Sequence, residues 1–562
     1  MVQAAARLDV LVPKTLARLD VSQAGVCPVV LVVVPMAGTG ARYRRAGHLQ
    51  PKPLIDVDGL PMIERVVAMF PGQERFLFIV NRDHARSSPL LSVLARVAPQ
   101  ALVRIIEPHS DGPIETLLRA EADIPDEEAV VVNYCDFGAT WSYADFLSWW
   151  KQGGFAAAMT AYRGFHPHSL GPTLYAYMQN EGERVTAIKE KGHFTNDRMS
   201  ELASSGLYAF SSGALLKRAA HDLVAAATRV NGEFYVSTAV GSLIDAGMSV
   251  GVMELAHFFQ WGTPEDLADY VGWARALREA DAFRARVAGC ASSAALVVPM
   301  AGKGQRFRDR GFDEPKPFID VAGAPMAAQV LACLPRATDT RLATTALIAG
   351  HPLMASLAMR SPPQTRVCTL AAETAGQAAT VRAVIDDIDG QRPVLVASCD
   401  TGASYDLKRW TALCSSGDDD LIVWSARGHL PALWRPQQYG WMDADDDGRV
   451  RAVRVKVPLD TRPLAEQDTI LGTFFFSSQA LLVRELDALI RDDERVNGEL
   501  YLDTVARRMV ERGARVRVFR VDKWLPWGTP DELFTFRYWN DVFRQGRSWP
   551  SSTLPTSGST HG

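Results

Sequence analysis

Two glycines, an arginine and a lysine occur early in the chain with a spacing that suits polyphosphate binding. An apolar run leads into Gly38, Gly40 and Arg42, and Lys52 follows between two prolines. Glycines after a strand let backbone N–H groups approach phosphate oxygens, and a guanidinium can hold two such oxygens at once. The prolines stiffen the backbone around Lys52 and keep its ammonium at a defined place. We therefore expect a triphosphate-binding site here.

The second half of the chain repeats this group. Gly302, Gly304, Arg306 and Lys316 follow the first set at a shift of 264 residues. Two further repeats lie at a shift of 266 residues, namely NGEFY at Asn231 with NGELY at Asn497, and WGTPED at Trp261 with WGTPDE at Trp527. Solenoid units have periods of only about 20–50 residues. The chain therefore contains two copies of one whole domain, which we call copy one and copy two.

Other phosphate-binding motifs do not fit these loops. The dinucleotide motif G-x-G-x-x-G needs a third glycine, whereas Tyr43 stands there in copy one and Phe307 in copy two. The P-loop pattern G-x-x-x-x-G-K-[ST] is absent. A plain surface turn with a solvated lysine is the alternative for either element alone, but both elements in both copies favour a phosphate site.

An aspartate follows the fourth expected strand of each copy, at Asp136 and Asp400. Ligands of open α/β sheets bind at the carboxyl ends of strands, and a carboxylate there can hold Mg²⁺ against a triphosphate. The alternative is an aspartate that caps a helix or a turn. We expect these two residues to be metal ligands.

Apolar runs alternate with helical patterns along each copy. Copy one has expected strands at 28–34, 76–80, 102–106 and 129–133, and expected helices at 61–69, 88–97 and 115–121. Matching strands of copy two are expected at 295–298 and 393–397. This alternation is typical of an α/β domain with a mostly parallel, Rossmann-like sheet. The predicted fold class is two such domains in tandem.

The repeat and the local composition set the expected boundaries. An Ala- and Arg-rich segment at 272–293 has the spacing of a helix that closes copy one and runs into a linker. The last residues are rich in Ser, Thr, Pro and Gly, a composition typical of disorder. We expect an N-terminal extension at 1–26, domain one at 27–280, a linker at 281–293, domain two at 294–547 and a disordered tail at 548–562.

The overall composition excludes several classes of protein. The chain has 562 residues, of which 47% are hydrophobic and 22% charged, and a net charge of −4, so no global field favours nucleic acid or anionic membranes. Seven cysteines without a CxxC pair make neither a disulfide framework nor a zinc site. No apolar stretch approaches the ~20 residues of a membrane span. We expect a cytoplasmic protein without nucleic-acid or membrane partners; the sequence does not indicate an oligomeric state.

The strand followed by G-x-G-x-R and then by P-K-P resembles the sugar-phosphate nucleotidyltransferase family, in the branch found among capsule and surface-polysaccharide enzymes. The resemblance covers roughly residues 30–270 and 294–540. It implies that the glycine loop and the arginine hold the triphosphate and that the lysine neutralises charge around the α-phosphate. The catalytic roles then fall on Arg42, Lys52, Arg306 and Lys316, and nucleotide binding on Gly38, Thr39, Gly40, Gly302, Lys303 and Gly304.

The resemblance also implies a base-contacting turn and an acceptor pocket. The turn falls on Gly112 and, with a better match, on Gly376; for Gly112 a helix start without a ligand is an equal alternative. A family Glu-Lys pair for sugar hydroxyls and sugar phosphate falls on Glu190 and Lys191, whereas copy two keeps only Lys456, after Val455. Copy two also has Tyr439-Gly440 where copy one has Tyr175-Ala176. The two acceptor pockets should therefore differ.

One departure from the family concerns its metal site. Related enzymes carry a second metal-binding aspartate two residues before the glycine of the Gly-Thr motif, where this chain has Gln260 and Pro526. Either Mg²⁺ is held by one aspartate with phosphates and water, or another carboxylate, such as Glu233 or Glu499, assists. The Trp-Gly-Thr-Pro segment itself suits a helix start, with threonine as N-cap and proline in the first turn.

The expected function is the transfer of a nucleotidyl group from an NTP to a sugar or polyol phosphate, with release of pyrophosphate and with Mg²⁺ as cofactor. The expected partners are the NTP and the phosphorylated acceptor, and the product is an activated precursor of surface polysaccharide. An alternative is a regulatory or scaffold protein that binds nucleotide or nucleotide-sugar without turnover in one or both copies. A Rossmann oxidoreductase is disfavoured by the missing third glycine, and no hexapeptide-repeat domain is visible.

Overall fold

The computed structural model describes residues 30–544, which form two compact units. Unit one consists of residues up to 164 and 173–264, and unit two of residues 165–172 and 265 onwards. The extension expected at 1–26 and the tail expected at 548–562 lie outside the described residues. In the described part, no helix has the length and apolar character needed to cross a bilayer.

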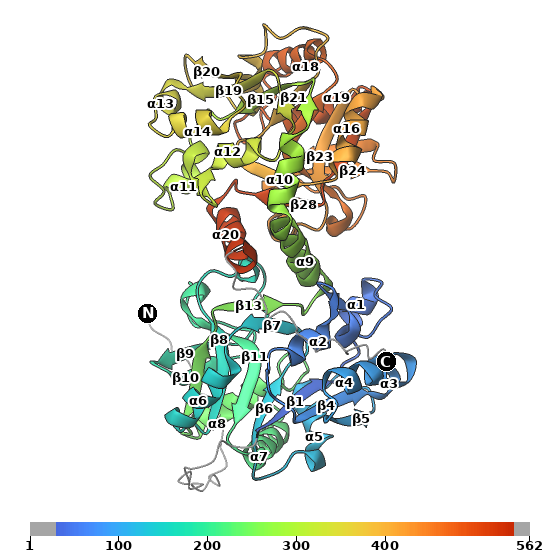
Figure 1. The fold of residues 1–562 in the computed structure, drawn as a ribbon, viewed down its shortest axis with the longest axis vertical. Coiled ribbons are helices and arrows are strands. Elements are labelled where there is room, and N and C mark those ends of the chain that lie inside the picture. Colours follow the sequence, from blue (N-terminus) through green and yellow to red (C-terminus); the bar gives the residue numbers. More distant parts are fainter. Residues whose placement is uncertain (1–29, 545–562) are drawn as a thin grey trace, which may run out of the picture. The chain divides into compact units, whose positions relative to one another are not determined.

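Unit one is built on a nine-stranded mixed sheet with the order β5-β4-β1-β6-β11-β8-β12-β10-β9 (Figure 1). Neighbours β5, β4, β1 and β6 run parallel, as do β8 and β12, while β11 runs antiparallel to β6 and β8. The strands are β1 (Val30–Met36), β4 (Phe76–Asn81), β5 (Leu102–Ile106), β6 (Ala129–Asn133), β8 (Ala157–Tyr162), β9 (Tyr177–Glu181), β10 (Arg184–Lys189), β11 (Leu202–Phe210) and β12 (Val250–Glu254). The four strands predicted for copy one are β1, β4, β5 and β6.

Short helices connect these strands and two small ribbons flank the sheet. The helices are α1 (Ala41–Arg45), α2 (Met62–Val67), α3 (Arg82–Ser87), α4 (Leu90–Val97), α5 (Pro113–Leu118), α6 (Tyr143–Gly153), α7 (Gly213–Ala225) and α8 (Val236–Asp245). The ribbons pair β2 (Asp56–Val57) with β3 (Leu60–Pro61) and β7 (Phe137–Thr140) with β13 (His257–Gln260). Helices α5, α7 and α8 share one hydrophobic core with the sheet, into which β1 sends Leu31 and Val33.

Unit two repeats this architecture. Its sheet runs β20-β19-β15-β21-β26-β23-β27, with β24 paired to β26 and β25 paired to β24. The strands are β15 (Ala295–Pro299), β19 (Thr340–Thr345), β20 (Thr365–Leu370), β21 (Val394–Ala397), β23 (Leu421–Ala426), β24 (Gly440–Ala444), β25 (Val450–Val455), β26 (Asp468–Phe476) and β27 (Val516–Arg520). Ribbons pair β14 (Ala291–Ser292) with β18 (Arg336–Ala337), β16 (Asp320–Val321) with β17 (Ala324–Pro325), and β22 (Thr401–Ser404) with β28 (Lys523–Pro526). The predicted tandem α/β fold is confirmed.

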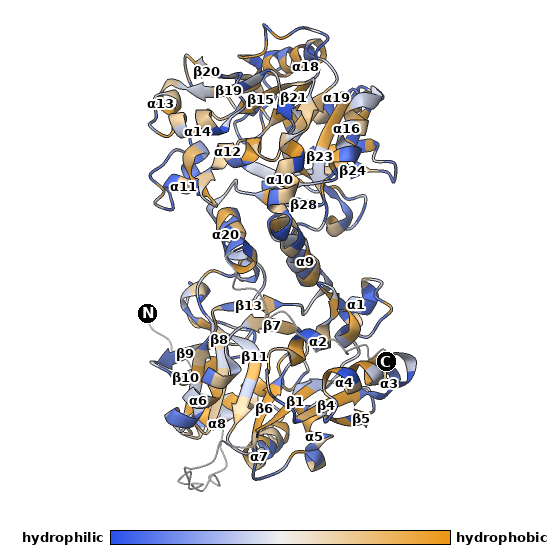
Figure 2. Cartoon of the chain, in the orientation of Figure 1, coloured by the Kyte–Doolittle hydropathy of each residue, from blue (hydrophilic) through white to orange (hydrophobic). Residues whose placement is uncertain are grey.

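The helices of unit two include two that precede its first large strand. They are α9 (Pro264–Arg278), α10 (Ala280–Ala288), α11 (Gln305–Arg308), α12 (Met326–Leu331), α13 (Ala346–Ala349), α14 (Met354–Arg360), α15 (Gln377–Arg382), α16 (Leu407–Ser416), α17 (Leu430–Trp434), α18 (Gln479–Arg491), α19 (Leu502–Glu511) and α20 (Pro530–Arg544). Figure 2 shows that the strands carry mainly hydrophobic residues, whereas the helices alternate between hydrophobic and hydrophilic ones, as expected for elements that bury one face.

The compact units do not follow the expected boundary at residue 280. The helix expected within 272–293 to close domain one falls on the end of α9 and on α10, which belong to unit two. Tyr270 and Trp273 of α9 contact Trp539 and Phe536 of α20. The segment expected as a linker at 281–293 contains most of α10 and the strand β14. The repeat marks where the sequence pattern recurs, whereas the packing of large aromatic side chains decides to which unit the helix belongs.

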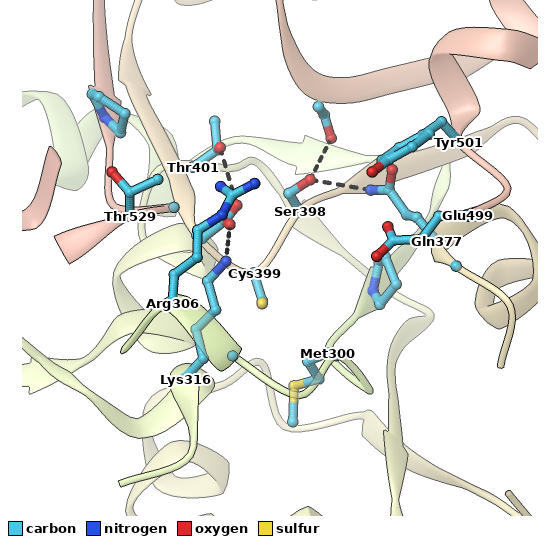
Figure 3. Close-up of a pocket in the computed structure, with 18 of the residues that line it drawn as sticks. Met300, Arg306, Lys316, Gln377, Ser398, Cys399, Thr401, Glu499, Tyr501 and Thr529 are labelled. Carbon is cyan, nitrogen blue, oxygen red and sulfur yellow. Dashed lines mark hydrogen bonds and ion pairs between the residues drawn. The ribbon is translucent and has the colours of Figure 1, made fainter. Parts of the chain in front are cut away.

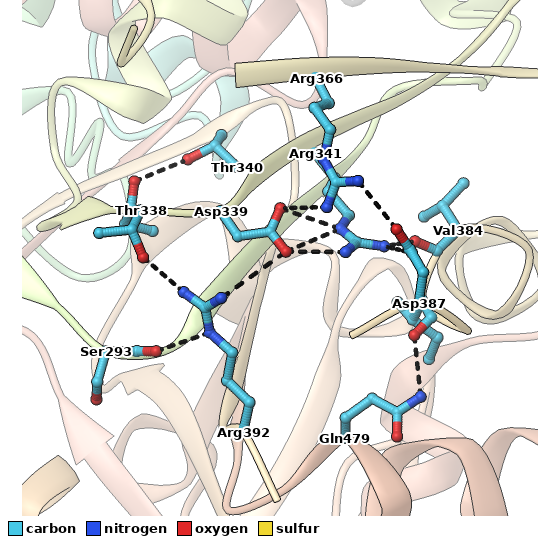
Figure 4. A network of polar contacts seen from close by, with 12 residues as sticks. Ser293, Thr338, Asp339, Thr340, Arg341, Arg366, Val384, Asp387, Arg392 and Gln479 are labelled. Carbon is cyan, nitrogen blue, oxygen red and sulfur yellow. Dashed lines mark hydrogen bonds and ion pairs between the residues drawn. The ribbon is translucent and has the colours of Figure 1, made fainter. Parts of the chain in front are cut away.

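A buried arginine network lies beside β19 in unit two (Figure 4). The Arg341 side chain is 2% exposed and donates to Asp339, to Asp387 and to the carbonyl of Val384. Arg366 of β20 contacts the same two aspartates. Strand pairing aligns Arg341 with Leu77 of copy one, so a hydrophobic position in one copy carries a charged network in the other.

Candidate active site

The glycine loop of each copy lies at the carboxyl end of the first sheet strand and passes over the lysine. Gly40 caps α1 with φ +63°, a left-handed conformation that favours glycine. A Cβ at Gly40 would lie 3.7 Å from the Cβ of Lys52, and the corresponding distance from Gly304 to Lys316 is 3.0 Å. Gly38 is exposed and Thr39 half-buried in the same loop. Glycine at this position thus lets the loop cross the lysine closely.

The lysine and the strand-end aspartate meet in both copies. Lys52 Nζ lies 2.5 Å from Asp136 Oδ2 and donates to the carbonyl of Gly262 at 3.1 Å. Lys316 and Asp400 form the same ion pair. The geometry follows from the sheet, because β1 and β6 are adjacent parallel strands whose carboxyl ends lie at one edge. Residues far apart in sequence thereby form one charged centre.

In copy two, the partners of this pair favour each other's charged form. Burial lowers the pKa of Lys316, but the charges and hydrogen bond of Asp400 outweigh it and raise the pKa overall. Burial likewise raises the pKa of Asp400, and Lys316 reverses the effect, so that the pKa lies below its usual value. Burial and the charge of Asp400 raise the pKa of the neighbouring Cys399 thiol to about 12. A thiol with so high a pKa is a poor nucleophile.

The Trp-Gly-Thr segment of each copy closes the site from the other side. The N–H of Trp261 donates to the carbonyl of Asp136, and that of Trp527 to the carbonyl of Asp400. In copy one, the Tyr43 hydroxyl donates to the carbonyls of Trp261 at 2.6 Å and Thr263 at 2.9 Å. Tyr43 therefore ties the helix after the glycine loop to this segment, which explains an aromatic residue where dinucleotide-binding proteins have glycine.

Copy two encloses a cavity of about 600 Å³ lined by the predicted site residues. In Figure 3, Arg306 and Lys316 reach into it from one side, while Gln377, Glu499 and Tyr501 line the other. Gly302, Gly304, Gly376, Asp400 and Lys456 also line this cavity. Lys303 lies there as well, and its ammonium pairs with Glu373 at 2.9 Å. All residues predicted for copy two therefore surround one space; Arg42, the counterpart of Arg306, is exposed on α1.

The two predicted base-contacting turns have a structural requirement of their own. Gly112 has φ +98° and Gly376 φ +131°, and a Cβ on either would lie 2.7 Å from backbone atoms of Phe234 or Leu500. These partners belong to the NGE-[FL]-Y segments, which hydrogen-bond to the turns through Phe234 N to Asp111 O and Leu500 N to Ala375 O. The close approach of two backbones accounts for both glycines, whether or not they contact a nucleotide.

The NGE-[FL]-Y repeat combines a turn with a glutamate and a tyrosine that contact each other in copy one. Asn231 and Gly232 have φ +50° and +85°, as in a tight two-residue hairpin turn. Beyond the turn, the Tyr235 hydroxyl donates to Glu233 at 2.7 Å, and the Lys191 ammonium lies 4.2 Å from the Tyr235 ring centre. In copy two, Lys456 lies 5.2 Å from the ring of Tyr501. These tyrosines were not among the predicted site residues, although the repeat contained them.

The predicted acceptor residues of copy one lie together. Lys191 adopts φ +51° directly after Glu190, whose carboxylate accepts a hydrogen bond of 2.5 Å from Ser237 on α8. Burial raises the pKa of Glu190, against the opposing effects of Ser237 and Lys191. In copy two, Lys456 adopts φ +63° and Asp503 of α19 lines the same cavity. Our sequence comparison of the Glu-Lys segments missed Asp503, because Asp503 aligns with Ser237 of copy one and not with Glu190.

The residues present fit a divalent cation that is held partly by its substrate. Within residues 30–544, no three His, Cys, Asp or Glu side chains gather as a metal site. In copy two, Asp400 Oδ2 and Glu532 Oε2 lie 3.1 and 3.2 Å from the point where a Cβ on Gly528 would stand. Glu532 also accepts a hydrogen bond from Tyr439 at 2.9 Å. Glu532 is thus a second carboxylate near Asp400 that could assist a cation, in addition to Glu233 and Glu499, which we considered from the sequence.

Comparison with known proteins matches each copy to one family. The family model described as the MobA-like NTP transferase domain matches residues 32–193 and 296–457. The bifunctional protein GlmU of Rhodopseudomonas palustris is 25% identical over 280 residues, which cover 48% of this chain and 56% of that protein. GlmU of Heliobacterium modesticaldum is 27% identical over 226 residues, 39% of this chain and 45% of that protein. The chain thus spans about half the length of these curated relatives.

Comparison with solved structures gives matches that cover less than half of this chain. A nucleoside-diphosphate-sugar pyrophosphorylase from Vibrio cholerae RC9 is 20% identical, with a TM-score of 0.36, and covers 43% of this chain and 99% of its own. An inositol-1-phosphate CTP transferase from T. maritima is 16% identical, with a TM-score of 0.33, and covers 43% of this chain and 91% of its own.

Proposed function

Because this chain belongs to the MobA-like NTP transferase domain family, whose domain it contains twice, we propose that it transfers a nucleotidyl group from an NTP to a phosphorylated sugar or polyol. The observation that carries this proposal is the ion pair of Lys52 with Asp136, placed directly beneath a glycine loop and repeated by Lys316 with Asp400. A binding protein without turnover has no need of such a charged centre in both copies.

The proposed reaction is an in-line displacement. An oxygen of the acceptor phosphate attacks the α-phosphorus of the NTP, a new P–O bond forms, the bond between the α-phosphorus and the bridging oxygen breaks, and pyrophosphate leaves. No protein nucleophile is required, in keeping with the protonated thiol of Cys399. Catalysis consists of positioning and of neutralising the charge that develops on the phosphate oxygens.

The side chains divide this work between them. Arg42 and Arg306 grip the triphosphate from the helix after the glycine loop, and Lys52 and Lys316 neutralise charge at the α-phosphate. Asp136 and Asp400 would hold Mg²⁺ together with phosphate oxygens, and the bound cation would offset the charge of the triphosphate. Lys191 and Lys456 bind the acceptor phosphate. The product would be an activated sugar precursor, of the kind used for surface polysaccharide.

A substrate screen tests the proposal. The full chain is incubated with each of the four NTPs and a panel of sugar and polyol phosphates in the presence of Mg²⁺, and pyrophosphate release is measured. We expect release with at least one pair of substrates, and its loss in the Asp136→Asn/Asp400→Asn double variant. Nucleotide binding without pyrophosphate release across the whole panel would instead support the regulatory or scaffold alternative.

A further inference from the structure

The acceptor sides of the two copies differ at three matching positions, and the three differences compensate one another. Copy one has Ala176, Glu190 and Ser237, where copy two has Gly440, Val455 and Asp503. Strand pairing supports this alignment, because Tyr177 pairs with Lys189 in copy one and Trp441 with Arg454 in copy two. Among these three positions, each copy therefore has one carboxylate, and the two carboxylates come from different elements.

Asp503 reaches the cavity across Gly440. A Cβ on Gly440 would collide with Asp503 Oδ2 and would lie 2.9 Å from the Cδ1 of Ile470. Gly440 is extended backbone in β24 and not a left-handed position, so the requirement for glycine is one of space. Copy one has Ala176 at the position of Gly440 and the shorter Ser237 at the position of Asp503. The glycine and the aspartate of copy two thus form a sterically linked pair.

The same geometry brings Asp503 next to Val455, which is the counterpart of Glu190. Gly440 pairs directly with Val455 across β24 and β25, and Val455 is the counterpart of Glu190. A side chain that lies over Gly440 is therefore next to the strand end from which Glu190 projects in copy one. Lys456, the residue after Val455, lines the cavity together with Asp503 and Tyr501.

The environments of the two carboxylates also correspond. Burial raises the pKa of Asp503, and the charge of Lys456 opposes this shift, as Lys191 does for Glu190. Each carboxylate adjoins a left-handed lysine that lies near a tyrosine ring. A buried carboxylate is costly unless donors satisfy it, and a ligand that fills the cavity can supply them.

Resting on the proposed function, we propose that Asp503 binds acceptor hydroxyl groups in copy two, so that this pocket takes a polyhydroxylated phosphate ester whose phosphate lies at Lys456. The carboxylate projects from α19 and not from the turn after a strand, so it meets the acceptor from another direction than Glu190 does. The two copies therefore select acceptors that differ in the arrangement of their hydroxyl groups.

Equilibrium binding tests this assignment without requiring turnover. The full chain with Glu190→Ala/Lys191→Met, which removes the acceptor groups of copy one, is titrated calorimetrically with inorganic phosphate and with the 1-phosphates of glucose, galactose and mannose. The ratio of sugar-phosphate affinity to phosphate affinity isolates the contribution of the hydroxyl groups. We expect at least one sugar phosphate to bind more tightly than phosphate.

Substitution of Asp503 should act on that ratio alone. Asp503→Ser should lower this affinity ratio about tenfold or more, which is the usual effect of losing a hydrogen bond to a charged group, and should leave phosphate affinity unchanged.

Two further variants test the geometry. Gly440→Ala should cause the same loss although Asp503 is still present. Adding Val455→Glu to Asp503→Ser should restore sugar-phosphate binding, with a changed order of preference among the sugars. Asp446→Ser, on the exposed turn between β24 and β25, is the matched control.

The outcomes separate this inference from the proposed function. A ratio that stays within twofold in both Asp503→Ser and Gly440→Ala, with both variants folded by circular dichroism, would overturn the role of Asp503. So would a parent protein that binds no sugar phosphate more tightly than phosphate. An absence of pyrophosphate release from wild type in the substrate screen would refute the proposed function. The affinity ratio would still test the role of Asp503, because the binding experiment does not depend on turnover.

Discussion

Lys52 Nζ and Asp136 Oδ2 lie 2.5 Å apart although 84 residues separate them in the sequence. Lys316 and Asp400 form the same ion pair, and they too are 84 residues apart in the sequence. Each pair joins the segment after the glycine loop to the end of the fourth strand of the parallel part of the sheet. The carboxylate proposed to hold Mg²⁺ is thus bound by the lysine proposed to act on the α-phosphate. When a triphosphate binds, its negative charges can balance both the lysine and a divalent cation, so that the two positive charges can lie in the same site.

Removal of the lysine should abolish most of the activity. In the variant Lys52→Met/Lys316→Met, we expect pyrophosphate release to fall by about 10²–10³-fold, because each lysine stabilises charge in a partly buried site. The KM for the acceptor should change little, since we propose that the lysines act at the α-phosphate of the nucleotide. Steady-state kinetics with the substrates found in the screen measure both effects.

Lys217→Met provides the control for this experiment. Lys217 pairs with Asp126 on the surface of α7, and such exposed pairs contribute about 0–1 kcal/mol to stability. Its activity should equal that of wild type. Retention of half or more of the activity in the double variant would contradict the catalytic assignment of Lys52 and Lys316.

The arginines of the glycine loops should act mainly on the nucleotide. Arg42→Ala/Arg306→Ala should lower kcat/KM for the NTP by about 10²-fold or more, as expected when a phosphate contact made in the transition state is lost. Both arginines are exposed, so the melting temperature should stay unchanged. Values of kcat/KM within twofold of wild type would rule out the phosphate grip.

Much of this arrangement was predictable because its elements are local in sequence. The apolar runs at β1, β4, β5 and β6 and the glycine loop that follows β1 are continuous patterns. Strand adjacency then follows from the α/β rules, which bring Asp136 to the same edge as the loop. The threonine expected to cap a helix does so in copy two, where Thr529 Oγ1 accepts from the N–H of Glu532 at 3.2 Å.

The missed residues depend on contacts that a sequence pattern does not contain. Asp503 enters the cavity because Gly440 leaves space for it, and the two are 63 positions apart on different elements. Glu532 lies in the first turn of a helix, where an acidic residue is ordinary, and only the tertiary fold brings it to Asp400. Helix α9 is bound to unit two by aromatic contacts whose partners lie in α20.

The network around Arg341 in Figure 4 should stabilise unit two. Arg341→Leu, which introduces the residue that copy one has at this place, should lower the free energy of unfolding of this unit by about 3 kcal/mol, because it leaves the Asp339 carboxylate without its buried partner. Arg366→Leu, at a half-exposed position of the same network, should cost less than about 1 kcal/mol. Urea unfolding followed by fluorescence measures both.

The loss at Arg341 should depend on pH in a defined direction. Burial raises the pKa of Asp339, but hydrogen bonds from Arg341 and Arg366 outweigh it and hold the pKa below the usual 3.8. Such a group stabilises the fold above pH 3.8, and this contribution disappears as the pH falls through the lower value of the folded state. The difference between wild type and Arg341→Leu should therefore shrink in strong acid; a difference that stays constant from pH 7 to pH 2 would contradict the assignment.

Asp503 should show the opposite behaviour, because burial raises its pKa above the usual 3.8. As the pH rises from that value, the unfolded chain loses this proton before the folded protein does. The free energy of unfolding therefore falls until the pH reaches the raised pKa of the folded state, and above that pH the loss stays constant. Lys456 and Tyr501 are the titratable groups that face Asp503. The charge of Lys456 limits the shift, and burial and Glu499 raise the pKa of Tyr501 to about 12, so that Tyr501 stays neutral throughout.

Asp503→Asn should therefore raise the melting temperature at pH 7 and have no such effect near pH 3. The exposed control Asp446→Asn should leave the melting temperature unchanged at both pH values. A melting temperature of Asp503→Asn at or below that of wild type at pH 7 would show that the carboxylate is already satisfied within the protein and does not await the hydroxyl groups of a ligand.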